Sequence, residues 1–205
     1  MTVSRTHEIT AHLSERLFFD YLKPMGLDYY LRSFGSATYK AENGSAKQPD
    51  CQFLPNRLPL ARTKKWPTLI VETGFLKSPG KLISDTRFWL SESNGDVQMV
   101  ITIMIGRSSP DIVLELWELV NDRVKRQQIV TISKGENNRV YLRGQPLIIS
   151  FDKLFLCPPS IPKETKISLD GAILEKDCSG GLGRARFLTT AQSIIGLRLL
   201  DFSSR

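Results

Sequence analysis

A short apolar segment with one acidic residue constrains the fold of this chain more than any other feature. It reads Pro67-Thr-Leu-Ile-Val-Glu72-Thr-Gly74 and is bounded by proline and glycine. Its length and its β-branched residues favour a buried central strand over a helix. A carboxylate in such a strand is costly to bury unless it is paired or binds a metal. Glu72 therefore predicts either a buried pair with a lysine or arginine, or a functional site.

Helical and strand patterns on both sides of this segment predict an α/β domain. Apolar residues at helical spacing predict an amphipathic helix over residues 6–22. Ser78 followed by Pro79 predicts the start of a second helix, which ends near Glu92. The segment 39–65 is rich in glycine and proline and predicts irregular loops around one short strand. Further strands are expected at 50–54, 97–105, 112–120, 128–132 and 139–142, and further helices at 151–156 and 189–200.

Composition excludes several classes of protein. The chain has 205 residues, of which 41% are hydrophobic, and this is enough for one domain with its own core. No apolar run approaches the roughly 20 residues of a membrane-spanning helix, and the N-terminus lacks the apolar stretch of a secretory signal peptide. We therefore expect a single domain over residues 1–205, with no membrane partner, in an intracellular protein that is either cytoplasmic or nuclear.

The cysteines and histidines exclude further chemistries. Cys51, Cys157 and Cys178 are widely spaced and have no histidine nearby, which disfavours both a zinc cluster and a disulfide framework. The chain has two histidines, His7 and His12, and both lie in the N-terminal segment. A hydrolase that uses histidine as its general base is therefore disfavoured. Any chemistry must depend on carboxylates, lysines or a metal.

Basic residues gather in one part of the chain. The net charge is +7, and the segment from Arg32 to Trp66 contains seven basic residues but only two acidic ones. This distribution is typical of a surface that binds a polyanion such as nucleic acid, although solubility alone would also account for it. The residues predicted to contact a phosphate backbone, with a solvated loop as the alternative, are Arg57, Arg62, Lys64 and Lys65.

Two carboxylates are candidates for one metal site. Asp50 begins one predicted strand, and Glu72 lies near the C-terminal end of the next. Carboxylates that project from adjacent strand ends can bind a hard cation such as Mg²⁺ or Mn²⁺, with water and phosphate oxygens as the remaining ligands. The alternative for Asp50 is that it caps a turn after Pro49.

Three segments in this order resemble the core of the PD-(D/E)XK nuclease superfamily, whose fold is αβββαβ. They read Lys47-Gln-Pro-Asp50, Pro67-Thr-Leu-Ile-Val-Glu72-Thr-Gly74 and Leu82-Ile-Ser-Asp85-Thr-Arg-Phe88-Trp89-Leu90. The similarity is greater to fungal restriction-endonuclease-like proteins of this superfamily, and it covers roughly residues 45–118. It implies an α/β fold with a restriction-endonuclease-like αβββαβ core, a mixed central sheet and additional β-rich C-terminal elements.

The resemblance implies a Mg²⁺-dependent nuclease that hydrolyses phosphodiester bonds in DNA, with Asp50 and Glu72 as the metal ligands. The superfamily usually places a lysine two residues after the glutamate, where this chain has Gly74. Lys47 or Lys77 would then supply the positive charge that stabilises the attacking water or the phosphate. We favour Lys47, which lies three residues before Asp50.

Asp85, Lys81 and Glu15 are further candidates for the site. The resemblance implies that Asp85 faces the site, whereas its spacing from Lys81 also fits an ordinary ion pair on a helix surface. Glu15 in the first helix is either an additional acidic site residue or a surface carboxylate. Trp89 is predicted to pack in the core, and the glycine-rich segment 180–186 is interpreted as a turn.

A second reading keeps the fold without the chemistry. In it, the chain is a catalytically inactive nuclease-fold module that has lost the lysine and binds nucleic acid or a protein partner, in an effector or incompatibility role. Nucleases of this superfamily often cut duplexes as dimers, so a homodimer is compatible with the resemblance. No heptad pattern in the sequence identifies an interface.

Overall fold

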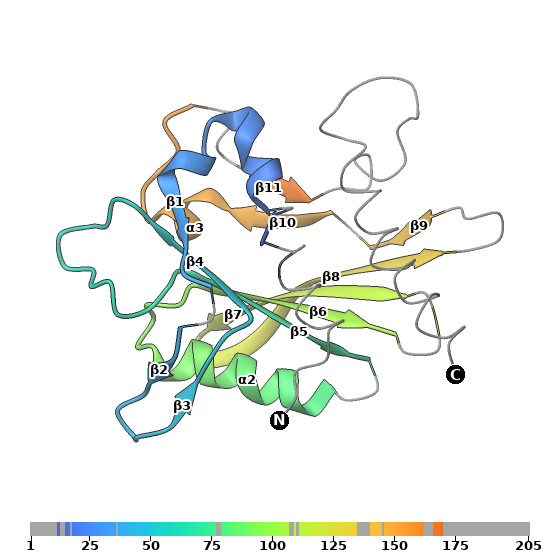
Figure 1. Cartoon of the computed structure of the whole chain (residues 1–205), viewed down its shortest axis with the longest axis horizontal. Helices are drawn as coiled ribbons and strands as arrows, with labels where there is room; N and C mark the ends of the chain where they lie inside the picture. Colours follow the sequence, from blue (N-terminus) through green and yellow to red (C-terminus); the bar gives the residue numbers. More distant parts are fainter. Residues whose placement is uncertain are drawn as a thin grey trace.

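A mixed β-sheet with one long helix against it dominates the computed structural model of this chain (Figure 1). The structure describes residues 12, 15–16, 18–35, 37–76, 79–106, 109, 111–134, 140–144, 146–161 and 166–169. Lys77, Cys178, the glycine-rich segment 180–186 and the predicted helix 189–200 lie outside the described residues. None of the described helices is both long enough and apolar enough to cross a lipid bilayer.

Seven strands of the described chain form the central sheet, in the order β1-β4-β5-β6-β7-β8-β9. They are β1 (Leu31–Ser33), β4 (Cys51–Pro55), β5 (Leu69–Phe75), β6 (Met99–Ile105), β7 (Ile112–Val120), β8 (Arg123–Lys134) and β9 (Val140–Arg143). Among these pairs β5 and β6 run parallel and the others antiparallel. A parallel pair needs a crossover connection, and here α2 (Pro79–Glu92) provides it.

The order of elements matches the predicted αβββαβ core. The described residues between His12 and Leu22 are helical, and the short helix η1 (Lys23–Met25) ends at Gly26, whose φ of 69° is readily adopted by glycine. Strands β1, β4 and β5 follow, then α2, then β6. The α/β class, the mixed sheet and the β-rich second half are confirmed, and the fold is restriction-endonuclease-like in this order of elements.

Several short strands were not predicted from the sequence. They are β1, the hairpin formed by β2 (Tyr39–Lys40) and β3 (Ala46–Lys47), and the pair formed by β10 (Leu147–Ser150) and β11 (Lys166–Leu169). Strands of two to four residues are too short to show the alternation of apolar and polar residues by which longer strands are recognised. The helices η2 (Asp28–Tyr30) and α3 (Phe151–Phe155) complete the described elements.

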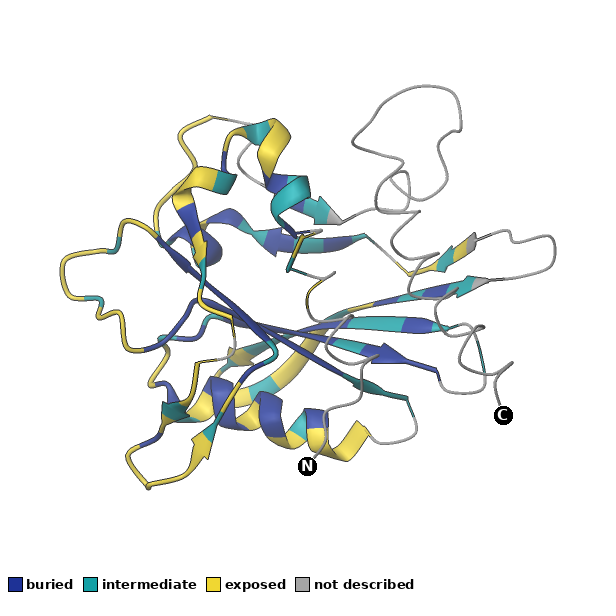
Figure 2. Ribbon diagram, viewed as in Figure 1, coloured by how far each residue is buried: buried dark blue, intermediate teal, exposed yellow. Residues whose placement is uncertain are grey.

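The two faces of β5 belong to different cores. Leu69 and Val71 face a large apolar cluster that also contains Phe53, on the side away from α2. Ile70 packs with Trp89 of α2 on the opposite side. Figure 2 shows β4 and β5 buried along most of their length, while α2 has one buried and one exposed face. Because successive side chains of a strand alternate between faces, Glu72 lies on the side covered by α2.

Candidate active site

Glu72 is buried between β5 and α2. Its side chain is 4% exposed, and the indole Nε1–H of Trp89 donates a hydrogen bond of 2.6 Å to its Oε1. Oε2 accepts no hydrogen bond from the part of the chain that the structure describes. Trp89 packs in the core, as predicted, but the sequence did not indicate that it also positions this carboxylate. The site therefore has one fixed and one available carboxylate oxygen.

The surroundings of Glu72 favour its protonated form. Burial raises the pKa of Glu72 from its ordinary value to about 8, and the neighbouring carboxylates of Asp50 and Asp85 also raise it. The hydrogen bond from Trp89 and the positive charge of Lys81 act in the opposite direction. A cation at this site would compete with the proton on Glu72, and once bound its charge would offset the cost of ionising the carboxyl group.

Asp50 lies beside Glu72 at the start of the neighbouring strand. Cys51 of β4 pairs with Val71 of β5 in antiparallel register, so the preceding residue, Asp50, stands opposite Glu72. Oδ2 of Asp50 accepts hydrogen bonds from the backbone N–H of Thr73 at 2.7 Å and from the Thr73 hydroxyl at 2.8 Å. These bonds fix the carboxylate at the edge of β5. Nothing in the sequence distinguished Thr73 as a residue of this site.

Asp85, at the middle of α2, binds two lysines. It is 7% exposed, and its Oδ1 accepts a hydrogen bond from Nζ of Lys47. Nζ of Lys81 lies 3.8 Å from Oδ2 of Asp85, so the helical ion pair anticipated from the spacing is also present. The Lys47 ammonium lies 5.5 Å from the centre of the Phe88 ring. The structure thus places Lys47, Lys81 and Asp85 together, and Asp85 is close enough to Glu72 to raise its pKa.

The β2–β3 hairpin that carries Lys47 is held against α2 and the central sheet. The ring of Tyr39 stacks on Trp66 at 5.2 Å with an angle of 18° between the planes, and its hydroxyl donates a hydrogen bond to Gln52. Asn43 at the hairpin turn donates a hydrogen bond of 2.9 Å to Glu92 at the end of α2. These contacts hold the hairpin at both of its ends, so the position of Lys47 is set by packing.

Gly74 follows Glu72 by two residues, and α2 closes the space beside it. A Cβ atom at residue 74 would lie 2.7 Å from Cδ1 and 3.0 Å from Cγ of Leu82, which is buried. Atoms this close would overlap, so a longer side chain at residue 74 requires that Leu82 move. The close packing of α2 on β5 therefore accounts for the glycine.

The remaining acidic candidate, Glu15, lies near the start of β4. Its carboxylate is one of the charges that, after burial, raise the pKa of the Cys51 thiol to about 12, and Asp50 contributes to the same rise. Cys51 follows Asp50 directly, so Glu15 and Asp50 approach the same thiol. Lys77, the other lysine candidate, lies outside the described residues.

The predicted basic contacts lie at the other end of β4. Arg62 is turned inward, with its guanidinium donating to the carbonyl oxygens of Trp66 at 2.7 Å and Asp96 at 2.9 Å, and pairing with the Asp96 carboxylate at 2.9 Å. Burial lowers the pKa of Arg62. Lys64 and Lys65 are exposed in the same loop. Arg62 therefore shapes this loop, while the two lysines are accessible to a ligand.

The donor set is compatible in kind with a hard cation. Within the described residues, no three histidine, cysteine, aspartate or glutamate side chains come close enough to form a ligand cluster. Asp50 and Glu72 supply two carboxylates, and Mg²⁺ is commonly bound by one or two carboxylates with water and substrate phosphate as further ligands. The pair therefore fits Mg²⁺ better than a metal that needs a complete cage of protein ligands.

The protonation of Glu72 makes folding stability depend on pH. In the unfolded chain Glu72 ionises near 4.5, whereas in the folded protein its pKa is about 8. The folded state therefore binds more protons over this interval, and its stability falls as pH rises. In buffer with EDTA, we expect the free energy of unfolding of the native protein to fall between about pH 4.5 and 8 relative to that of Glu72→Gln. Urea titrations at several pH values measure the free energy of unfolding of both proteins. If this free energy changes with pH equally in the two proteins, the prediction is wrong.

Filling the space at Gly74 is expected to destabilise the protein. Gly74→Ala places its Cβ against Leu82, and overpacking of this kind costs roughly 1–3 kcal/mol. Gly80→Ala is the matched control, because a Cβ atom at this helical position meets nothing within 4 Å. Urea denaturation of both variants, and of Gly74→Ala combined with Leu82→Ala, measures the effect. The double variant should lose less stability than the two single changes together, and simple additivity would argue against the contact.

Comparison with known proteins finds similarity in structure but none in sequence. No protein-family model matches this sequence, and no curated protein matches it. Among solved structures, the type IIG restriction endonuclease BpuSI aligns with a TM-score of 0.44 and 12% identity, over 94% of this chain and 17% of that enzyme. The chain thus spans less than a fifth of the length of BpuSI. The description of the fold as restriction-endonuclease-like therefore rests on the order and direction of the strands in this structure.

Proposed function

We propose that this protein is a Mg²⁺-dependent nuclease that hydrolyses phosphodiester bonds in DNA. The observation that carries the proposal is that two carboxylates, Asp50 and Glu72, lie opposite each other on neighbouring segments of the sheet, with Lys47 held nearby by Asp85 of α2. Phosphodiester hydrolysis needs a cation at the phosphate and a positive charge near the developing negative charge. The proposal includes the greater similarity to fungal restriction-endonuclease-like proteins that the sequence indicates.

Each residue of the site has a separate role in the proposed reaction. Asp50 and Glu72 would hold Mg²⁺, or Mn²⁺ in its place, and the metal would supply an activated water and neutralise the phosphate. Trp89 orients Glu72 through its hydrogen bond to Oε1, which keeps Oε2 directed away from the indole. Lys47 would stabilise negative charge on the phosphate or on the attacking water.

Binding of the substrate backbone is assigned to the basic loop at the far end of β4. Lys64 and Lys65 are exposed there, and Arg57 precedes them in the same loop. Contacts of this kind neutralise phosphates without reading bases, so sequence specificity would be low and affinity would fall steeply with salt. A homodimer, with two such sites on one duplex, and a cytoplasmic or nuclear location are part of the same proposal.

A second function is favoured by the closed position at residue 74. Because Leu82 fills this space, the usual lysine is absent, and the described residues hold no cluster of three metal-binding side chains. These two features are compatible with a nuclease-fold module that binds nucleic acid or a protein partner without cleaving a substrate. In that case Lys47, Lys81 and Asp85 form a structural ion-pair network.

Metal titration with plasmid cleavage distinguishes the two functions. We expect calorimetry to detect Mg²⁺ and Mn²⁺ binding by the native protein, more tightly at pH 9 than at pH 7, because Glu72 must lose its proton, whose pKa is about 8. Asp50→Ala combined with Glu72→Ala should lose both metal binding and cleavage. A control, Glu118→Ala, removes a carboxylate of β7 paired with Lys153 and should behave like the native protein. Metal binding that survives the double substitution would refute the site.

The lysine that acts in the site is identified by removing its charge. Lys47→Met keeps an alkyl chain beside Phe88 but removes the ammonium, and cleavage should fall by about 10²- to 10³-fold while metal binding is retained. Lys81→Met is the comparison, because Lys81 is 81% exposed and shares the same partner, Asp85. Cleavage rates at saturating metal measure both. If cleavage falls as much or more in Lys81→Met, the stabilising charge comes from Lys81 of α2 and not from Lys47.

A further inference from the structure

A cavity of about 740 Å³ opens at the end of β4 that lies away from the carboxylates. Three segments form it: η2, the loop that follows β4, and the residues after α3. Figure 1 shows these segments gathered at one edge of the molecule. The volume of the cavity lies within the range of about 300 to 1,000 Å³ that is usual for small-molecule sites. Its lining includes Tyr30, Pro55, Arg57, Phe155 and Cys157.

The walls of this cavity are fixed by contacts between the segments. The backbone N–H of Asn56 donates a hydrogen bond of 2.8 Å to the carbonyl of Tyr30, and its side-chain amide donates to the carbonyl of Tyr29. Thr68, next to the start of β5, donates a hydrogen bond of 3.0 Å to the carbonyl of Leu154 in α3. The cavity therefore exists before any ligand arrives, which lowers the entropic cost of binding.

The chemistry of the lining is apolar and aromatic with a single positive charge. Among the described lining residues, Arg57 is the only one that carries a charge. Tyr30 lines the cavity and is nevertheless 53% exposed, and the adjacent Tyr29 is 80% exposed. A ligand that fits this lining has a flat or apolar body and one anionic group. Lys64 and Lys65 in the same loop extend the positive charge beyond the cavity, which favours a ligand with further phosphates.

We propose that this cavity binds an unpaired nucleotide of a nucleic-acid strand, with the base against Tyr30 and the phosphate at Arg57. The inference takes from the proposed function only that the ligand is a nucleic acid, and it requires neither metal nor cleavage. Folds that bind single strands combine a basic groove with aromatic rings on which bases stack. A base inside a duplex is already paired and stacked, so the cavity selects single-stranded segments over duplex.

The position of the cavity separates it from the proposed metal site. Asp50 precedes β4 and Pro55 ends it, and a strand of five residues is about 17 Å long. A nucleotide held at Arg57 is therefore several nucleotides away, along the strand, from a phosphate beside Asp50. The cavity would fix an unpaired segment at a distance from the scissile bond.

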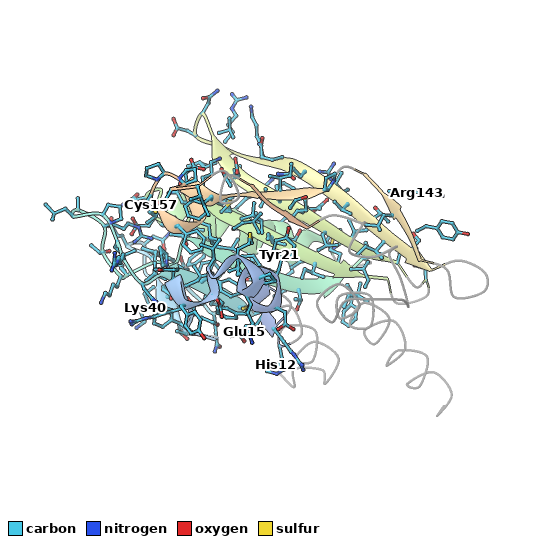
Figure 3. The ribbon with its side chains drawn as sticks, turned by 90° about the horizontal axis from the view of Figure 1, so that it is seen from above. His12, Glu15, Tyr21, Lys40, Arg143 and Cys157 are labelled. Atoms are coloured by element: carbon cyan, nitrogen blue, oxygen red, sulfur yellow. The ribbon has the colours of Figure 1, made fainter. Side chains whose placement is uncertain are left out.

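Binding of end-labelled oligonucleotides, measured by fluorescence anisotropy in EDTA, tests this inference. The probes are oligothymidylate and oligouridylate of about 12 nucleotides, a length typical of single-strand sites, and a blunt DNA duplex of equal length. The variants are Tyr30→Ala, Tyr30→Phe and Arg57→Ala. The matched controls are Tyr141→Ala, whose ring is 49% exposed on β9, and Arg123→Ala at the start of β8. Figure 3 shows Arg143 of β9 and Cys157 of the cavity at opposite ends of the molecule.

We expect the native protein to bind at least one single strand more tightly than duplex. Tyr30→Ala should weaken that binding at least about five-fold, while Tyr30→Phe, which keeps the ring, should bind like the native protein. Arg57→Ala should weaken binding and reduce the salt dependence by about one phosphate contact. The controls should bind normally. Tighter binding of either the deoxyribose or the ribose strand supports the site and identifies the preferred sugar.

Four results would overturn the inference: no single-strand binding by the native protein, equal loss in Tyr141→Ala, equal loss in Tyr30→Phe, or a loss in Tyr30→Ala that is as large on duplex as on single strands. Photocrosslinking of the native protein to an iodouracil oligonucleotide gives an answer that does not depend on variant folding. The crosslinked peptide should contain Tyr30 or residues 151–158, and crosslinks confined to other peptides would refute the site. The metal titration of Asp50→Ala with Glu72→Ala is independent of these results, so failure of the cavity and failure of the nuclease are distinguishable.

Discussion

The free-energy cost of burying a carboxylate in the central β-sheet governs how α2 packs against β5. Glu72 is nearly inaccessible to solvent, and the chain meets the cost of its burial with the indole hydrogen bond from Trp89 and with a raised pKa near 8. The indole reaches Glu72 only if α2 lies across β5, and the same crossover makes β6 parallel to β5. The direction of the strands and the environment of the acid are therefore consequences of one packing arrangement.

The same packing decides where a positive charge can stand. Leu82 of α2 presses against Gly74, so β5 itself cannot carry a lysine beside the glutamate without movement of the helix. The ammonium of Lys47 comes from the β2–β3 hairpin and is held by Asp85, which lies three residues after Leu82 in α2. Asp85 thus has two effects: its charge opposes ionisation of Glu72, and it holds a lysine close to the same region. In the proposed nuclease, Lys47 would therefore supply from the hairpin the positive charge that β5 does not carry.

Local patterns in the sequence were sufficient to predict the elements that form the core. The buried strand at β5 and the hairpin of β6 and β7 were predicted from runs of apolar and β-branched residues, and the helix that begins at Pro79 from its helical spacing. The structure confirms all of them. Asp50 and Glu72 were predicted to be neighbours because each stands at the end of an adjacent strand, and the register places them opposite each other.

Contacts between distant residues were not predictable in the same way. Lys47 and Asp85 are 38 residues apart, and Arg62 and Asp96 are 34 apart, so no helical or strand period relates them. The charge of Arg62 suggested a contact with phosphate, but composition does not reveal that a guanidinium is already surrounded by carbonyl oxygens. The hydrogen bond from Trp89 was missed for a related reason: periodicity shows which face of a helix is buried, but not which polar group lies beneath it.

The proposed metal site and the basic loop lie at opposite ends of β4. Asp50, Glu72 and Asp85 lie toward one end. Lys64, Lys65 and the cavity lie at the other end. The strand between them is about 17 Å long, roughly twice the screening length of about 8 Å at physiological ionic strength. The two ends are thus nearly independent electrostatically, so the nucleic-acid binding proposed for the basic end does not depend on whether the carboxylates have bound a metal.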